Sequence, residues 1–155
     1  MAKAKEQKEV TTYSLDTNVL VSHLRDDRFA RKTDRFLRRA MEKKTRLVIS
    51  DVAYAELYTG IYLSGDPKSE EARVQSFVAV NNIEVKTSKS LRIARRAGEL
   101  YSRHLSGRGS GIQRILPDFL IAAQAEAASH ALITWNVPDY KNLGLRIPAR
   151  SPDTA

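Results

Sequence analysis

The stretch Tyr13-Ser14-Leu15-Asp16-Thr17-Asn18-Val19-Leu20 decides how the rest of the chain is interpreted. It opens with residues that favour a buried β-strand, continues with a carboxylate, a hydroxyl and an amide, and becomes apolar again. A strand that ends in such polar residues before a helix places them at the carboxyl edge of a sheet, where open α/β proteins bind ligands. Asp, Thr and Asn also cap helices well, so this stretch alone fits a helix cap as well as it fits a site.

The composition is that of a single, basic globular domain. The chain has 155 residues, is 42% hydrophobic and 28% charged, and carries a formal charge of +8. Such a charge indicates a polyanionic partner, either nucleic acid or an anionic membrane. Without cysteine, disulfides and thiolate metal sites are excluded. No apolar run is long enough to span a membrane and the first residues lack the apolar core of a signal peptide, so we expect a cytoplasmic protein.

Short apolar strands alternate with helical patterns along the chain. This alternation predicts an α/β fold with a mainly parallel sheet that helices cover on both faces. We expect a flexible basic arm over residues 1–11, a single domain over 12–148 and a tail over 149–155. The predicted strands are 12–15, 47–49, 83–85 and 131–134, with a short edge strand at 145–147.

Polar residues converge on one edge of this predicted sheet. Asp16 and Asn136 directly follow predicted strands, Glu56 lies in the helix after the second strand, and Asp118 starts the helix before the fourth. Carboxylates this close raise one another's pKa and are rarely kept together without a cation. Ligands that are all oxygen suit Mg²⁺ or Mn²⁺. The alternatives are an exposed helical glutamate for Glu56 and a helix cap for Asp118.

Two basic segments are candidates for contact with phosphates. From Arg28 onward, the charges on the predicted helix that ends near Lys44 are nearly all positive. Residues 106–114 read Ser-Gly-Arg-Gly-Ser-Gly-Ile-Gln-Arg. The first could be a solvated helix face and the second an ordinary connector. Clustered acids that hold a divalent ion in a basic protein suggest phosphodiester hydrolysis, since the ion activates water and neutralises charge on the phosphate.

Four short motifs, in order, resemble the PIN-domain family and most of all VapC-type toxins. They are Leu15-Asp16-Thr17-Asn18-Val19-Leu20, Glu56-Leu57-Tyr58-Thr59-Gly60, Pro117-Asp118-Phe119-Leu120-Ile121-Ala122-Ala123 and Leu132-Ile133-Thr134-Trp135-Asn136. The resemblance implies a three-layer αβα fold, an Mg²⁺- or Mn²⁺-dependent endoribonuclease, a homodimer and inhibition by a cognate antitoxin. It also implies that Asp16, Glu56 and Asp118 are metal ligands, and that Thr17, Asn18 and Thr134 orient ligands or water.

The sequence departs from that family pattern at one position. Many members carry a fourth acid two residues after the threonine of the last motif, where this chain has Asn136; the next acid is Asp139. Asp139 could substitute, Asn136 could contribute a neutral oxygen, or a second metal ion could bind weakly. The alternative function is a non-catalytic RNA-binding protein that keeps the fold without metal competence. A phosphoacceptor domain would need a lysine and an acceptor acid that the sequence does not place convincingly.

Overall fold

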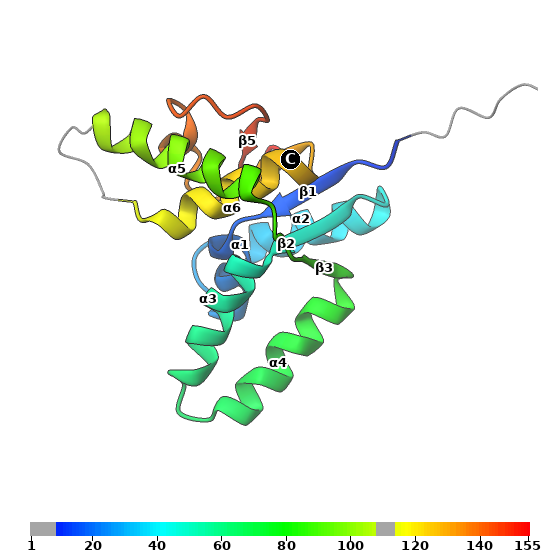
Figure 1. Ribbon diagram of the computed structural model, residues 1–155. Helices are drawn as coiled ribbons and strands as arrows, with labels where there is room; N and C mark the ends of the chain where they lie inside the picture. Colours follow the sequence, from blue (N-terminus) through cyan, green and yellow to red (C-terminus); the bar gives the residue numbers. More distant parts are fainter. Residues whose placement is uncertain (1–8, 108–113) are drawn as a thin grey trace, which may run out of the picture.

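Within residues 9–107 and 114–155, which the computed structural model describes, five parallel strands form a sheet (Figure 1). The strand order is β3-β2-β1-β4-β5, so β1 lies at the centre with β2 and β4 as its neighbours. All of the strands therefore end at the same edge. The strands are β1 Thr12–Leu15, β2 Arg46–Ser50, β3 Ile83–Lys86, β4 Ala131–Ile133 and β5 Ala149–Arg150.

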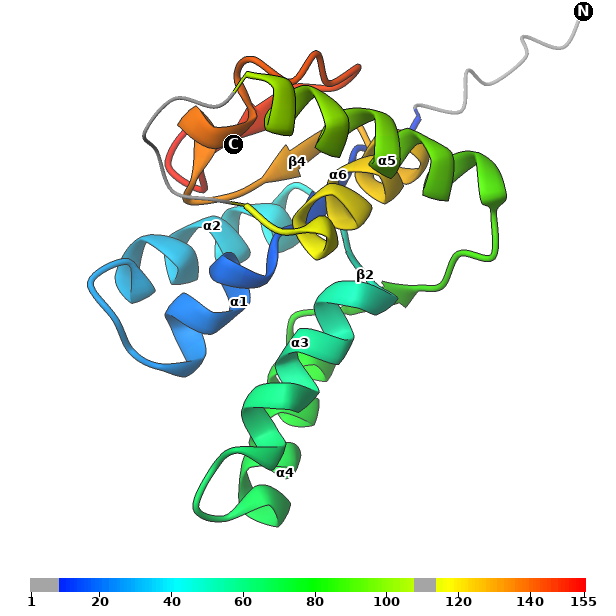
Figure 2. The same cartoon turned by 60° about the vertical axis from the view of Figure 1, so that its left-hand side comes forward.

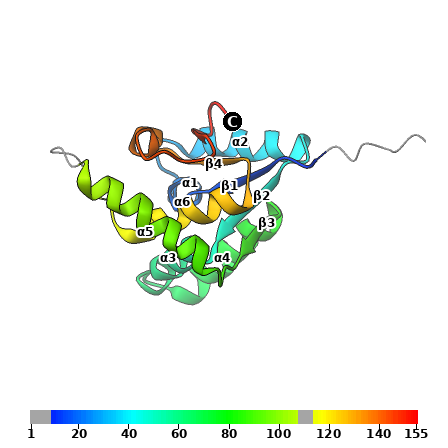
Figure 3. The same ribbon diagram turned by 45° about the horizontal axis from the view of Figure 1, so that its top comes forward.

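Helices join the strands and cover both faces of the sheet (Figure 3). The connections from β1 to β3 step in one direction across the sheet and the connection from β3 to β4 steps back, so right-handed crossovers put α5 and α6 opposite α2. The predicted three-layer αβα fold is confirmed. The helices are α1 Thr17–Leu24, α2 Ala30–Glu42, α3 Asp51–Tyr62, α4 Pro67–Val80, α5 Leu91–Ser106 and α6 Leu116–Ala128, and the 3₁₀ helix η1 is Val137–Tyr140.

Side chains of different kinds hold the two helical layers on the sheet. On one face Tyr13 of β1 stacks on Phe36 of α2, with ring centroids 6.4 Å apart. Helix α6 has small buried residues instead, among them Ala122 and Ala125, which let its backbone approach the sheet closely. Phe36 is almost fully buried, and it belongs to the same cluster of buried hydrophobic residues as Ala122 and Ala125 of α6. The core is therefore continuous across both layers.

Local signals set most of the helix starts. Asp66 caps α4 by accepting a hydrogen bond from the Ser69 N–H at 3.2 Å, and Pro67 occupies the first turn. Ser50 caps α3, since its hydroxyl accepts from the Ala53 N–H at 3.0 Å. Helices α3 and α4 lie side by side and extend away from the sheet (Figure 2).

The edge strand lies later in the chain than the sequence suggested. Residues 149–150, expected in a tail, form β5 and pair with Leu132 and Ile133 of β4, whereas 145–147 stay outside the sheet. The last residues also pack: Arg39 of α2 donates to the Pro152 carbonyl at 2.7 Å. Residues 1–8 of the expected basic arm lie outside the described residues. No helix of the described chain is long and apolar enough to cross a membrane.

Candidate functional site

Asp16 lies at the carboxyl edge of the sheet, between the ends of β1 and β4. Its N–H donates to the Ile133 carbonyl at 2.8 Å, which extends the pairing of the two strands by one residue. Asp16 occupies the N-cap position of α1, yet its side chain makes no capping hydrogen bond. Of the two readings of this stretch, the side chain therefore fits a site rather than a cap.

Three donors fix one oxygen of the Asp16 carboxylate. Oδ2 accepts from the Thr134 hydroxyl at 2.8 Å, the Asn18 amide at 3.2 Å and the Tyr140 hydroxyl at 3.2 Å. The residue is only 4% exposed. No described residue donates to Oδ1, which is the atom of Asp16 that is left for a cation. The three donors hold the carboxylate plane, so the direction of that free oxygen is set before anything binds.

Thr134 and Asn18 support this arrangement from both sides. The Thr134 hydroxyl, fully buried, also accepts from the Asn18 amide at 3.0 Å and from the Asn136 N–H at 3.1 Å. The Asn18 carbonyl oxygen accepts from the Trp135 N–H at 3.1 Å. The short chain segment after β4 is thus tied to the start of α1 through these two side chains, which the sequence had assigned to orienting ligands or water.

Glu56 faces the same edge from α3. The Thr17 hydroxyl donates to Glu56 Oε2, so the second residue of the opening motif orients the second acid. Glu56 is half-buried, and burial raises the pKa of its carboxyl. The hydrogen bond from Thr17 opposes this effect, while the charges of Asp118 and Asp16 add to it.

Asp118 and Asp139 both meet Arg114, which lies just before α6. Arg114 Nη2 donates to Asp139 Oδ2 at 2.7 Å, and Nη1 lies 3.4 Å from Asp118 Oδ1. The other oxygen of Asp118 accepts from the Ile115 N–H at 3.2 Å, which is a capping contact at the start of α6. Asp118 therefore caps its helix and faces the acidic site at the same time.

The charges of neighbouring acids affect the pKa of Asp16. Burial raises the pKa of Asp16, against the hydrogen bond from Thr134 and the positive charge of Arg114. The negative charge of Asp118 raises the pKa of Asp16 further. The charge of Asp118 thus acts on Asp16 as it does on Glu56, and a cation among these acids would relieve the repulsion.

The oxygen atoms of these side chains suit a hard divalent ion, although the side chains do not surround a common position for one. Asp16 has a free, oriented oxygen, and every candidate ligand is an oxygen, as Mg²⁺ and Mn²⁺ prefer. As placed in residues 9–107 and 114–155, no three His, Cys, Asp or Glu side chains lie close enough to hold one metal ion. Glu56 and Asp118, both partly exposed, would have to change side-chain conformation to close such a site.

Two residues of this site were not singled out from the sequence. Tyr140 is buried, and its hydroxyl lies between the Arg114 guanidinium and Asp16. Arg114 was noted only as the end of a basic loop. Its place four residues before Asp118, one helical turn away, could have indicated the contact. Asn136 is exposed, and only its backbone takes part in the hydrogen bonds described above.

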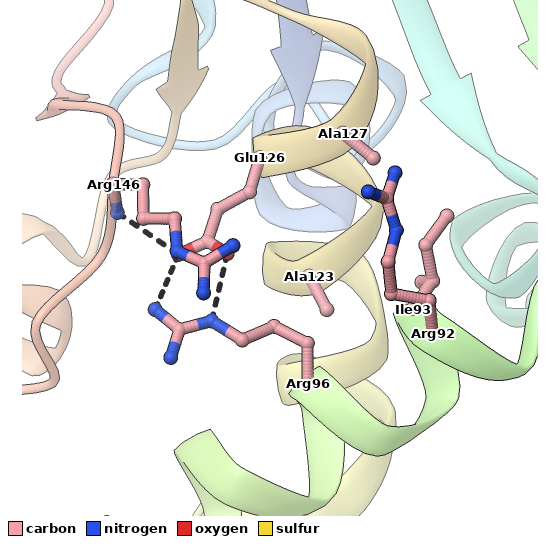
Figure 4. A pocket seen from close by; sticks show the side chains of 7 residues that line it. All are labelled: Arg92, Ile93, Arg96, Ala123, Glu126, Ala127 and Arg146. Atoms are coloured by element: carbon pink, nitrogen blue, oxygen red, sulfur yellow. Dashed lines mark hydrogen bonds and ion pairs between the residues drawn. The ribbon is translucent and has the colours of Figure 1, made fainter.

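A second polar hollow, of about 270 Å³, lies between α5 and α6 and does not suit a metal ion (Figure 4). Its acid, Glu126, accepts from Arg96 Nε at 2.8 Å, from Arg96 Nη2 at 2.9 Å and from the Arg146 N–H at 2.9 Å. Burial acts to raise the pKa of Glu126, but these hydrogen bonds outweigh burial and lower the pKa below its usual value. With Arg92 also in its lining, this hollow is basic, and its carboxylate is already neutralised.

A parallel α/β fold with oriented acids at the carboxyl edge matches one family of proteins. The model of the PIN domain matches residues 13–137, and this chain belongs to the PIN domain family. No curated protein matches the chain in sequence.

Solved structures of the same fold come from bacterial two-protein complexes. VapBC2 from Rickettsia felis, bound to a DNA fragment from their promoter, contains a chain that superposes with a TM-score of 0.74 and 22% identity, over 91% of this chain and 98% of that chain. A chain of DNA-bound VapBC from Salmonella typhimurium superposes with a TM-score of 0.69 and 22% identity, over 92% of this chain and 99% of that chain. A chain of VapBC-1 from nontypeable Haemophilus influenzae superposes with a TM-score of 0.70 and 21% identity, over 92% of this chain and 98% of that chain. At these identities the likeness shows the fold alone.

Proposed function

We propose that the chain is a metal-dependent endoribonuclease that hydrolyses RNA phosphodiester bonds. The observation that carries this proposal is the Asp16 carboxylate, buried at the sheet edge with one oxygen held by three donors and the other free. Glu56 and Asp118 face it, which fits a site for Mg²⁺ or Mn²⁺. A cytoplasmic location fits an RNA substrate and a chain without cysteine.

In this proposal Asp16, Glu56 and Asp118 hold the ion, and Thr17, Asn18 and Thr134 keep the ligands in place. A bound Mg²⁺ or Mn²⁺ would lower the pKa of a water molecule and neutralise charge that develops on the phosphate. The chain itself orients Asp16 and Glu56 through hydroxyl donors. Asp139 lies against Arg114, and Asn136 keeps its side chain exposed, so we assign both to the surroundings of the ion rather than to its ligands.

The exposed side of α2 is the surface we propose for the RNA backbone. Its arginines and lysines are mostly exposed and could neutralise phosphates next to the acidic site, since the start of α2 lies close to the segment after β4: the ring of Phe29 stacks on Trp135 at 4.4 Å. Arg39 is an exception, because it is half-buried and bonded to Pro152. Of the basic loop 106–114, residues 108–113 lie outside the described residues.

We further propose that the chain is the toxin of a type II toxin–antitoxin pair, and a homodimer. The antitoxin proposal is supported by the fold shared with the VapBC complexes and by a groove of about 610 Å³ between α1, α2 and α4. Leu37, Met41, Phe77 and Val80 give this groove apolar walls suited to a peptide segment. The dimer proposal is supported by Tyr62 and Leu63, 69% and 82% exposed at the end of α3.

The test is cleavage of total RNA by the purified chain with and without Mg²⁺ or Mn²⁺. We expect cleavage that requires one of these ions, that is abolished by EDTA and by Asp16→Asn, and that a Zn²⁺-selective chelator leaves intact. Asp51→Asn, at the start of α3 and outside the acidic site, is the matched control and should remain active. Cleavage that persists in excess EDTA would refute the metal mechanism. RNA binding without cleavage under any metal would favour the non-catalytic alternative.

A further inference from the structure

Arg114 is a buried arginine inside an acidic site, which is an unusual place for a permanent positive charge. It is 7% exposed, and its guanidinium contacts Asp139, Asp118 and the Tyr140 hydroxyl. Its Cζ also lies 4.7 Å from the centroid of the Tyr140 ring. Arginine keeps its charge at any pH at which proteins fold. The contacts on several sides hold the guanidinium in one position, unlike a surface arginine that is free to move.

The guanidinium bridges two carboxylates that come from different parts of the chain. Its two terminal nitrogens reach separate acids, Nη2 at 2.7 Å from Asp139 and Nη1 at 3.4 Å from Asp118. In sites with two metal ions, the ions lie about 3.5–4 Å apart and share carboxylates of this kind. Here the arginine fork already occupies the space between the two acids, and its hydrogen-bonded link to Asp16 runs through the Tyr140 hydroxyl.

We propose that Arg114 takes the place of a second cation, so that the chain holds one divalent ion among Asp16, Glu56 and Asp118 and none between Asp118 and Asp139. This inference rests on the proposed metal-dependent function. A second ion would have to displace the guanidinium and leave it buried without partners, which is strongly unfavourable. Asn136, three residues before Asp139, is neutral and adds no charge that would draw in a second ion.

The proposal predicts opposite effects for loss of charge and loss of structure. Arg114→Gln removes the positive charge and leaves Asp118 and Asp139 free, so two ions should bind. The first ion should also bind more tightly, because a neighbouring positive charge is gone. A purely structural role would weaken ion binding instead. Arg114→Lys keeps the charge and should still bind one ion.

The experiment counts Mn²⁺ on the full-length chain at neutral pH, by calorimetry and by electron paramagnetic resonance. We expect one ion for the unaltered chain and for Arg114→Lys, and two ions with dipolar broadening for Arg114→Gln. The matched control is Arg46→Gln, since Arg46 forms an exposed ion pair with Glu84 at the start of β2, at the opposite edge of the sheet. It should bind one ion with unchanged affinity. Circular dichroism verifies that each variant is folded.

Two ions on the unaltered chain, or one ion on folded Arg114→Gln, would overturn the proposal. The count on the unaltered chain decides the matter even where Arg114→Gln fails to fold, with one ion in support and none or two against. Since counting ions needs no RNA, the two proposals fail separately. A chain that binds one Mn²⁺ and cleaves nothing keeps this inference and loses the nuclease. A chain that cleaves RNA with two bound ions does the reverse.

Discussion

Tyr140→Phe removes one buried hydroxyl and should lower the stability of the fold measurably. That hydroxyl donates to Asp16 at 3.2 Å and accepts from Arg114 at 2.9 Å, and the side chain is 2% exposed. A hydrogen bond to a charged group contributes about 1.5–3 kcal/mol. Both partners keep other contacts, so we take the low end for each bond and expect a loss of about 3 kcal/mol in the free energy of unfolding. For a chain of this size that corresponds to a fall of roughly 6–12 °C in melting temperature.

The loss should depend on pH, because the hydroxyl acts on Asp16 in its charged form. Burial raises the pKa of Asp16 above its usual range, and the Tyr140 hydrogen bond opposes that rise. Above this raised pKa the variant loses a bond to a charged carboxylate, whereas below it the carboxyl is neutral and the bond is weaker. The destabilisation should therefore grow as the pH rises through the pKa of Asp16.

The assay is thermal unfolding of the metal-free chain at pH 8 and at the lowest pH at which the fold persists. Tyr101→Phe is the matched control, since its ring packs on Phe119 while its hydroxyl makes no hydrogen bond within the described residues. It should melt within about 1 °C of the unaltered chain, as substitutions without such a bond usually do. An equally small change for Tyr140→Phe, or an equal loss at both pH values, would refute the reasoning.

Three further predictions concern the acids and the basic surface. Asp16→Asn should raise the melting temperature of the metal-free chain at neutral pH and not in acid: a raised pKa means that stability is lost as the pH rises, and the amide avoids that loss. A uniform fall would indicate a structural role instead. Thr17→Val removes the hydrogen bond that lowers the pKa of Glu56, so the acid limb of the pH–rate profile should move to higher pH. The control is Thr59→Val, on the exposed part of α3, which should leave the acid limb unchanged. Three exposed arginines of α2 are to be replaced with Gln: Arg31, Arg35 and Arg38. The slope of log RNA affinity against log salt concentration should become shallower by roughly 0.7 for each phosphate that is no longer neutralised. An unchanged slope would mean that this helix faces solvent or a protein partner.

Local rules were sufficient to predict most of the fold. The run 12–15, Thr-Tyr-Ser-Leu, is rich in residues that favour strands and too short for a helix, and the structure has β1 at those residues. Asp66 and Pro67 start α4 because their capping and backbone preferences depend on the nearest few residues alone. The alternation of such elements then leaves few topologies other than a parallel sheet with helices on both faces.

The edge strand could not be placed in this way. Residues 145–147 are more apolar than 149–150, but strand β5 is short and pairs only with β4, so its register depends on the path of the preceding loop rather than on its own side chains. The expectation of a tail failed for the same reason. Nothing in the local sequence shows that the carbonyl of Pro152 meets Arg39, which is far away along the chain.

The candidate site was predictable in its residues and not in its contacts. Motif order placed Asp16, Glu56 and Asp118 at one edge; burial raises the pKa of Asp16 and of Glu56, and the charge of Asp118 raises both further. The network that orients Asp16 depends on Tyr140, which any sequence pattern would assign to the core. Whether a basic residue pairs with acids or faces solvent is a property of the folded chain, as Arg114 illustrates.

The stacking of Trp135 on Phe29 gives the protein an optical probe beside its acidic site. Trp135 is the single tryptophan of the chain, its indole N–H donates to Thr33 at 3.2 Å, and its backbone N–H is held by Asn18. Since Asn18 also donates to Asp16, one side chain links that carboxylate to the backbone of Trp135. We therefore expect excitation at the red edge of the tryptophan band to report events at this carboxylate in the unlabelled protein, free of a second indole signal, so that a stopped-flow trace separates the arrival of an ion from any later step.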